Sequence, residues 1–135
     1  MKIKDLDNQS HNWILTGNFA RANDTNKSKY HLLARKLLID TYPTLQLLEE
    51  VSIPLRRSET LYLDFYLPLK KLCVEVHGEQ HYSFSSFFHT NKLEFLLGQK
   101  RDNEKREWCE TNGIKYVVFP HNKTQQEWSN ELNVN

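Results

Sequence analysis

LYLDFYLPLKKLCVEVH, residues 61–77, contains two runs in which apolar side chains occupy every second position. The first run ends at Leu67 and carries Asp64 among its alternate residues; the second begins at Leu72 and carries Glu75 in the corresponding place. A period of two is typical of a β-strand with one buried face. The stretch therefore predicts two consecutive strands, each with one acidic residue on the face opposite its apolar side chains.

The connection between these strands, residues 68–71, is short enough to force a hairpin, so the strands are predicted to be antiparallel. A register centred on the middle of this connection places Asp64 directly across from Glu75. Residues that face each other in an antiparallel ladder project their side chains to the same side of the sheet. The sequence therefore predicts two carboxylates next to each other on one face.

Two interpretations of this carboxylate pair stay open. Mg²⁺ prefers hard oxygen ligands and needs only one or two protein carboxylates, so Asp64 and Glu75 with the backbone carbonyl of Val76 would supply a metal site. His77 would point to the same face and could position or deprotonate a water molecule. Alternatively, Asp64 pairs with a nearby Arg or Lys and His77 is a half-buried residue of the sheet. The spacing alone does not decide between them.

The segments around the hairpin predict a layered α/β domain. Apolar residues recur at helical spacing until Pro43, and a second helical stripe is interrupted at Gly98. The expected elements are helices over 28–42 and 99–110, strands over 51–55, 61–67, 72–77 and 114–119, and a short closing helix around Trp128 and Leu132. Together they predict a mixed four-stranded sheet flanked by helices.

The composition suits one globular domain, because 39% of the 135 residues are hydrophobic. We expect this domain over 28–135, after an N-terminal segment, 1–27, that is either an arm or a short strand or helix on the core. The formal charge of +1 neither favours nor excludes nucleic acid. Lacking a long apolar run or a signal core, the chain is expected to be soluble, cytoplasmic and without membrane contact. Cys73 and Cys109 suit reduced core thiols.

Three motifs follow one another in order along the chain. They are Asp64-Phe65 at the end of one strand, Glu75-Val76-His77-Gly78-Glu79-Gln80-His81 on the next, and Asp102, Lys105 and Gly113 in and after the following helix. This ordered set resembles the PD-(D/E)XK nuclease superfamily, and most closely its small members related to very-short-patch-repair DNA endonucleases. The resemblance covers roughly residues 30–120. It implies a restriction-endonuclease-like core with the order α-β-β-β-α-β.

The resemblance implies that Asp64 and Glu75 are acidic metal ligands and that Val76 adds its carbonyl. The expected cofactor is Mg²⁺, and Mn²⁺ is also compatible with a site that includes His77. The expected reaction is hydrolysis of a DNA phosphodiester bond by an endonuclease. An RNA substrate and a homodimer stay open, and the alternative is an inactive nuclease-fold module that binds nucleic acid or a partner protein.

One position departs from the family pattern, because His77 stands where the superfamily usually has a lysine. Three explanations follow: His77 or His81 works with the metal, the active site has decayed, or a lysine from the following helix, Lys100 or Lys105, takes the role. Members also often carry an acidic residue on the first helix. The first helix here has no Glu and only Asp40 at its far end, and Glu49 or Glu50, beside the first strand of the core, could take that place.

Basic and aromatic side chains give candidates for nucleic-acid contact. Lys29, Arg35 and Lys36 on the first helix and Lys100, Arg101 and Lys105 on the second could contact phosphates, although a solvated helix face is the competing explanation. The rings of Tyr82, Phe84, Phe87 and Phe88 could stack on bases or pack into the core. The histidine and cysteine spacing matches no zinc motif, so zinc is not expected.

Overall fold

The computed structural model describes residues 1–19, 28–78 and 92–133, which fold into a mixed α/β arrangement. Its elements are β1 (Lys2–Lys4), β2 (Ser10–Asn12), β3 (Asn18–Phe19), α1 (Lys29–Thr41), β4 (Leu48–Arg56), β5 (Glu59–Leu67), a 3₁₀ turn η1 (Pro68–Lys70), β6 (Leu72–His77), α2 (Lys92–Thr111), β7 (Lys115–Pro120) and α3 (Gln125–Leu132). The predicted order helix, three strands, helix, strand is confirmed by α1, β4, β5, β6, α2 and β7.

The central sheet has the order β3-β4-β5-β6-β7 in the described part of the chain. Its strands are antiparallel from β3 to β6, and β7 runs parallel to β6, so the sheet is mixed as predicted. The four predicted strands are β4 to β7. A fifth strand that was not predicted, β3, adds two residues at the β4 edge. Residues 1–19 thus include short strands, one of the two alternatives left open for the N-terminal segment.

The β5–β6 register agrees with the prediction. Phe65 lies opposite Val74 and Leu67 opposite Leu72, which is the register centred on the middle of the connection. The connection is not a tight two-residue turn, because η1 is followed by Lys71 in the left-handed region, at φ 47°. The chain reverses its direction at this residue, and β6 pairs with β5 in the predicted register although the connection is not a tight turn.

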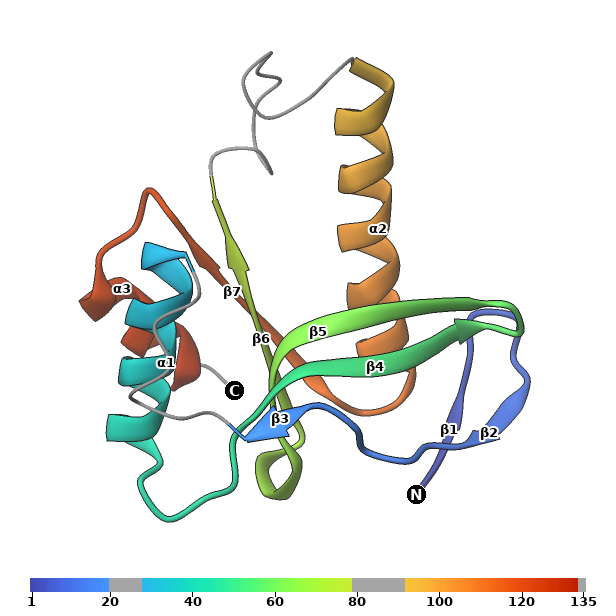
Figure 1. Ribbon diagram of the computed structural model, residues 1–135, viewed down its shortest axis with the longest axis horizontal. Helices are drawn as coiled ribbons and strands as arrows, with labels where there is room; N and C mark the ends of the chain where they lie inside the picture. Colours follow the sequence, from blue (N-terminus) through green and yellow to red (C-terminus); the bar gives the residue numbers. More distant parts are fainter. Residues whose placement is uncertain (20–27, 79–91, 134–135) are drawn as a thin grey trace.

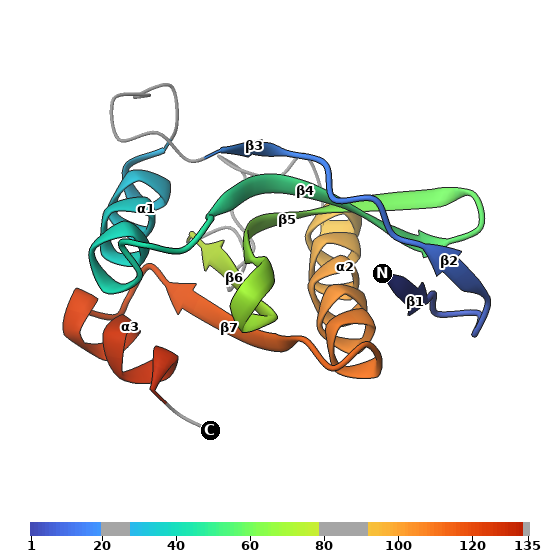
Figure 2. The same ribbon diagram turned by 90° about the horizontal axis from the view of Figure 1, so that it is seen from below.

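The helices lie on both faces of the sheet (Figures 1 and 2). α1 and α3 cover one face, where Phe65 and Val74 pack against Leu38 and Trp128. α2 covers the other face and shares a second core with the N-terminal hairpin β1–β2; its main members are Trp13, Val51, Tyr66, Cys73, Trp108 and Cys109. Both cysteines are free and buried, as expected for core thiols, and burial raises the pKa of the Cys73 thiol.

Helix α2 is longer than predicted. It continues without a break through Gly98, where the apolar stripe suggested an interruption, because the surrounding residues are good helix formers. Its N-terminal half projects beyond the sheet (Figure 1) and exposes Leu93, Leu96 and Leu97. Within the described residues, α2 and the other helices are too short or too polar to cross a membrane.

Gly17 connects the N-terminal strands to the sheet, and we expect Gly17→Ala to lower the free energy of unfolding by about 1–3 kcal/mol. Its φ is +106°, and an added Cβ would lie 2.5 Å from the backbone oxygen of Glu49. Urea denaturation measures the effect. Gly113→Ala is the matched control, because its φ is +69° but no atom lies within 4 Å of the added Cβ. Equal losses in the two variants would show that the contact with Glu49 is relieved at no cost.

Candidate active site

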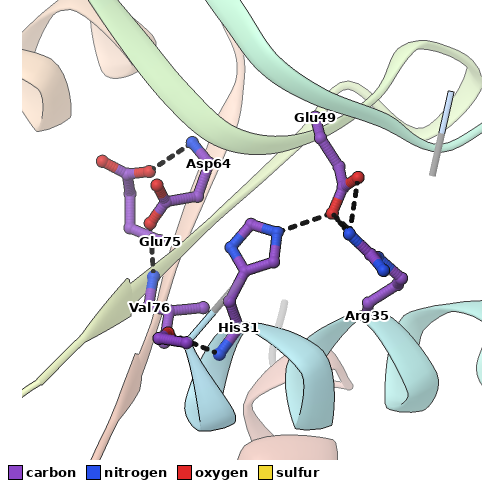
Figure 3. A network of polar contacts seen from close by, with 7 residues as sticks. His31, Arg35, Glu49, Asp64, Glu75 and Val76 are labelled. Carbon is purple, nitrogen blue, oxygen red and sulfur yellow. Dashed lines mark hydrogen bonds and ion pairs between the residues drawn. The ribbon is translucent and has the colours of Figure 1, made fainter. Parts of the chain in front are cut away.

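The two predicted acidic residues meet where β5 and β6 stop pairing regularly. The last recorded backbone pair on this side is Phe65 with Val74. Beyond this pair, the two strands are joined by hydrogen bonds from backbone to side chain. The backbone N–H of Asp64 donates to Glu75 Oε2 at 2.6 Å, and the backbone N–H of Val76 donates to Asp64 Oδ2 at 2.9 Å (Figure 3). Each carboxylate thus satisfies a backbone donor of the other strand, and this cross-linking holds the two acids next to each other.

The backbone carbonyl of Val76 belongs to the same edge of β6. In a strand, the N–H and C=O of one residue point toward the same neighbouring strand. Since the N–H of Val76 reaches Asp64 on β5, its carbonyl also points to the β5 side. The next carbonyl, that of His77, points the other way and accepts from the N–H of His121 at 2.8 Å, beside β7. Asp64 and Glu75 thus lie next to each other, and the carbonyl of Val76 points to the same side of β6 as its N–H, toward β5.

A lysine from α2 completes this group. Nζ of Lys105 lies 2.7 Å from Oε1 of Glu75, and the two side chains are 17% and 2% exposed. Lys105 is one of the two helix lysines that the sequence offered in place of the missing strand lysine. The other, Lys100, lies on the same helix and is exposed. The fold thus brings Lys105, and not Lys100, to the carboxylate pair.

The carboxyl of Glu75 titrates far from its ordinary range. Burial and the nearby charge of Asp64 raise the pKa of Glu75 to about 8, although Lys105 pulls it downward. Burial disfavours the ammonium form of Lys105, but Glu75, Asp64 and Asp102 outweigh this and raise its pKa. With this pKa, the carboxyl of Glu75 is largely protonated at neutral pH, so the charge of Lys105 faces mainly Asp64 and Asp102. A further cation beside Glu75 would favour its ionised form and lower its pKa.

We expect this shift to make stability depend on pH. Because the pKa of Glu75 is higher in the folded chain than in the unfolded chain, its contribution is fully present below about pH 4.5 and is lost as pH rises toward 8. Relative to wild type, Glu75→Gln should gain about 2 kcal/mol in unfolding free energy between pH 5 and pH 7. Urea denaturation with a chelator present measures this. A difference that stays constant with pH would contradict the raised pKa.

A cavity of about 530 Å³ lies between the sheet and α2. Asp64 and Lys105 line it, together with Glu50 of β4 and with Arg101 and Asp102 of α2. Glu50 has φ +54°, in the left-handed region that residues other than glycine rarely adopt. Such backbone strain persists only where the surrounding structure holds it, and it is found often at functional sites. Of the two glutamates proposed as substitutes for a helix acid, Glu50 is the one that lines the cavity.

The other glutamate has a different role. Glu49 is buried and binds α1: His31 Nε2 lies 2.6 Å from its Oε1, and Arg35 donates from Nε at 3.0 Å and from an η nitrogen at 3.1 Å (Figure 3). The His31 ring also stacks on Phe65, with centroids 4.5 Å apart. This network fastens α1 to β4 and to the residue that follows Asp64.

The predicted phosphate contacts therefore fall into two groups. Arg35 is only 2% exposed and is engaged by Glu49, so its expected place on a phosphate-binding surface is wrong; the helix turns this residue toward the sheet. Lys29 and Lys36 are exposed, and Lys36 pairs with Asp40 at 3.0 Å. Lys100 and Arg101 are exposed on α2.

His77, the one histidine of the second motif that the structure describes, does not line the carboxylate cavity. His77 is buried on β6, and its Nε2 lies 4.0 Å from Asp102 Oδ1. It lines a separate cavity of about 510 Å³ with Arg106 and Asp102. Asp102 thus borders both cavities. His81 and the aromatic residues 82–88 lie outside the described residues.

The donor set decides which metal this site fits. Over residues 1–19, 28–78 and 92–133, no three side chains of His, Cys, Asp or Glu are grouped closely enough to hold a metal. Two carboxylates and a backbone carbonyl do not fit zinc, which takes four ligands, mostly nitrogen and sulfur, at structural sites. They fit Mg²⁺, which keeps several waters and binds one or two protein carboxylates together with substrate phosphate.

Comparison with known proteins finds viral relatives that match slightly less than half of the chain. Uncharacterized protein 033L of Invertebrate iridescent virus 3 is 41% identical over 64 residues, 47% of this chain and 33% of the relative. Uncharacterized protein 307L of Invertebrate iridescent virus 6 is 43% identical over 61 residues, 45% and 31% respectively. Uncharacterized protein 094L of Frog virus 3 is 39% identical over 65 residues, 47% and 42%. The chain thus spans less than half the length of these relatives. No protein-family model and no solved structure matches it.

Proposed function

We propose that this protein is a metal-dependent nuclease with the restriction-endonuclease-like core of the PD-(D/E)XK superfamily, and that it hydrolyses phosphodiester bonds in DNA. The observation that carries the proposal is the cross-strand pair of Asp64 and Glu75, joined to Lys105 at the edge of a cavity. Two acids held together at a break in a sheet are unfavourable unless a cation offsets their repulsion. Lys105 offsets one of the two charges.

Asp64, Glu75 and the carbonyl of Val76 would hold Mg²⁺, which when bound lowers the pKa of a water molecule and shields charge on a phosphate. Lys105 has a raised pKa and stays protonated at neutral pH. It therefore acts as a fixed positive charge that stabilises a phosphate in the transition state, not as the group that removes a proton. Arg101 lines the same cavity and offers a second cation for the flanking backbone.

A binding module without catalysis is the second candidate. It is favoured by one observation: Lys105 already pairs with Glu75, so this carboxylate is compensated without any metal. In such a module the carboxylate pair would serve only to fasten β5 to β6 and α2. The two candidates differ in whether a divalent cation binds and whether a phosphodiester bond is cut.

The deciding experiment is a calorimetric titration of Mg²⁺ and Mn²⁺ into wild type and Asp64→Ala, followed by cleavage assays on plain, mismatched and branched DNA and on RNA. We expect ion binding that is lost in the variant, and cleavage that needs the ion. Gel analysis of the cleavage products distinguishes nicks from double-strand breaks. It therefore indicates whether one or two copies of the protein act on the DNA. No ion binding at millimolar concentration, with or without nucleic acid, would leave the binding module.

A further inference from the structure

An exposed aromatic ring stands at the candidate active site. Tyr62 is 58% exposed, whereas the other aromatic side chains whose burial the structure describes are buried or half-buried. It lies two residues before Asp64 on β5, so both side chains project to the same face of the strand. Both also line the cavity of about 530 Å³. A tyrosine ring left in solvent beside the acids is placed to contact what enters this cavity.

The helix side of the same cavity carries a glycine whose presence the fold does not explain. Gly98 lies inside α2, where glycine is less favourable than alanine. Its backbone is not in the left-handed region, and an added Cβ would meet only the tip of the Arg101 side chain at 3.8 Å, an ordinary contact. Neither conformation nor crowding therefore requires glycine here. What glycine does provide is bare backbone on the cavity wall, which allows a ligand to approach closely.

A cation adjoins this bare wall. Arg101 lies three residues after Gly98, on the neighbouring position of the same helix face, and lines the cavity as well. It is exposed and makes no ion pair with any other described residue. An aromatic ring, a wall of bare backbone and an exposed guanidinium are features that can bind one nucleotide: a planar base and its phosphate.

We propose that Tyr62 and Gly98 form the two sides of a slot for an unpaired nucleobase next to the bond that is cut, with Arg101 on its phosphate. This inference rests on the proposed nuclease function and specifies its substrate class. In a duplex both faces of a base are covered by its neighbours, so only an unpaired base can present a face to the tyrosine ring. The substrate is therefore DNA with single-stranded character at the cleavage point, such as a single strand, a flap or a mismatch.

The test measures binding separately from cutting. All variants are made on the Asp64→Asn background, and fluorescence anisotropy records the affinity for a short single strand and for the matching duplex. We expect Tyr62→Ala to weaken single-strand binding about 5- to 150-fold, the range measured for loss of one base–aromatic stack. Tyr62→Phe should bind as the parent does. Neither change should alter duplex binding by more than about twofold, because a paired base does not reach the ring.

Gly98→Ala gives the sharper signature, because its effects on stability and on binding should have opposite signs. A better helix former should raise the melting temperature by about 4 °C, while the new methyl group narrows the slot and weakens single-strand binding several-fold. Leu96→Ala, on the exposed surface of the same helix, is the control and should leave binding unchanged. Stabilisation without loss of binding, or wild-type binding by Tyr62→Ala, would overturn the slot.

The results also separate this inference from the function on which it rests. If wild type cuts no substrate but single-strand binding depends on Tyr62, the slot stands and the protein is a binding module. If wild type cuts duplex and single-stranded DNA equally and Tyr62→Ala cuts both as well, the nuclease stands and the slot is wrong.

Discussion

Asp64→Asn is expected to reduce the rate of DNA cleavage about 1000-fold while the protein stays folded. The substitution removes the negative charge that a cation requires, but keeps an oxygen in place. The amide oxygen can still accept the hydrogen bond from the backbone N–H of Val76, now 2.9 Å from Asp64 Oδ2. Catalysis and structure are therefore separated at this position. Cleavage of a labelled oligonucleotide in Mg²⁺ measures the first, and the urea midpoint measures the second.

Asp40→Asn is the matched control for this prediction. Asp40 is an exposed acid on α1 that pairs with Lys36, and it lines neither of the two cavities described above. Its replacement should leave cleavage within about twofold of wild type, since exposed pairs contribute little. A folded Asp64→Asn protein that cleaves as fast as Asp40→Asn would remove Asp64 from the proposed metal site.

The hairpin at the centre of the fold could be predicted because its information is local. Alternation with a period of two identified β5 and β6, and the four-residue connection left one register that buries both apolar faces. Helix α1 was equally local, since Ser28 caps its first turn and Pro43 follows its end. The position of Asp64 next to Glu75 follows from the alternation of β5 and β6 and from the length of their connection alone.

The parts that sequence reasoning missed depend on partners far along the chain. Residues 1–19 show no periodic pattern, and they are held by contacts such as the Trp13 indole N–H, which donates to the backbone oxygen of Ser52 at 3.0 Å. Arg35 is predicted to lie on an exposed helix face, as a phosphate contact or as a solvated residue, because a charged residue is usually exposed. Its burial depends on Glu49, 14 residues away on another element, and no local pattern reveals that pairing.

Lys105 is an intermediate case. The sequence named it beside Lys100 as a substitute for the missing strand lysine, but could not choose between them. The choice depends on how α2 is rotated against the sheet, and Trp108 and Cys109, buried against the sheet and the N-terminal hairpin, set that rotation. Lys105 lies nearly one turn before Trp108, so it also faces inward. Lys100 does not share this alignment and is exposed.

Lys105→Met is therefore expected to lower the cleavage rate about 100- to 1000-fold at pH 7, whereas Lys100→Met should change it less than about threefold. Two effects act together in Lys105→Met. The charge that would stabilise the phosphate is lost, and Glu75 loses the partner that lowers its pKa. Its carboxyl then stays protonated to higher pH and binds a cation less well. Cleavage by both variants between pH 6 and pH 9 is the measurement.

The two effects can be told apart by their pH dependence. Loss of cation binding through a protonated Glu75 should recover as pH rises, so the deficit of Lys105→Met should shrink by pH 9. Loss of transition-state charge should persist at every pH, and Lys105→Arg should restore part of it by returning the positive charge. A deficit that is independent of pH and unchanged in Lys105→Arg would mean that Lys105 acts through the packing of α2. Equal cleavage rates in Lys105→Met and Lys100→Met would exclude Lys105 as the substitute for the missing strand lysine. His77 or His81 would then be the remaining candidates for that role.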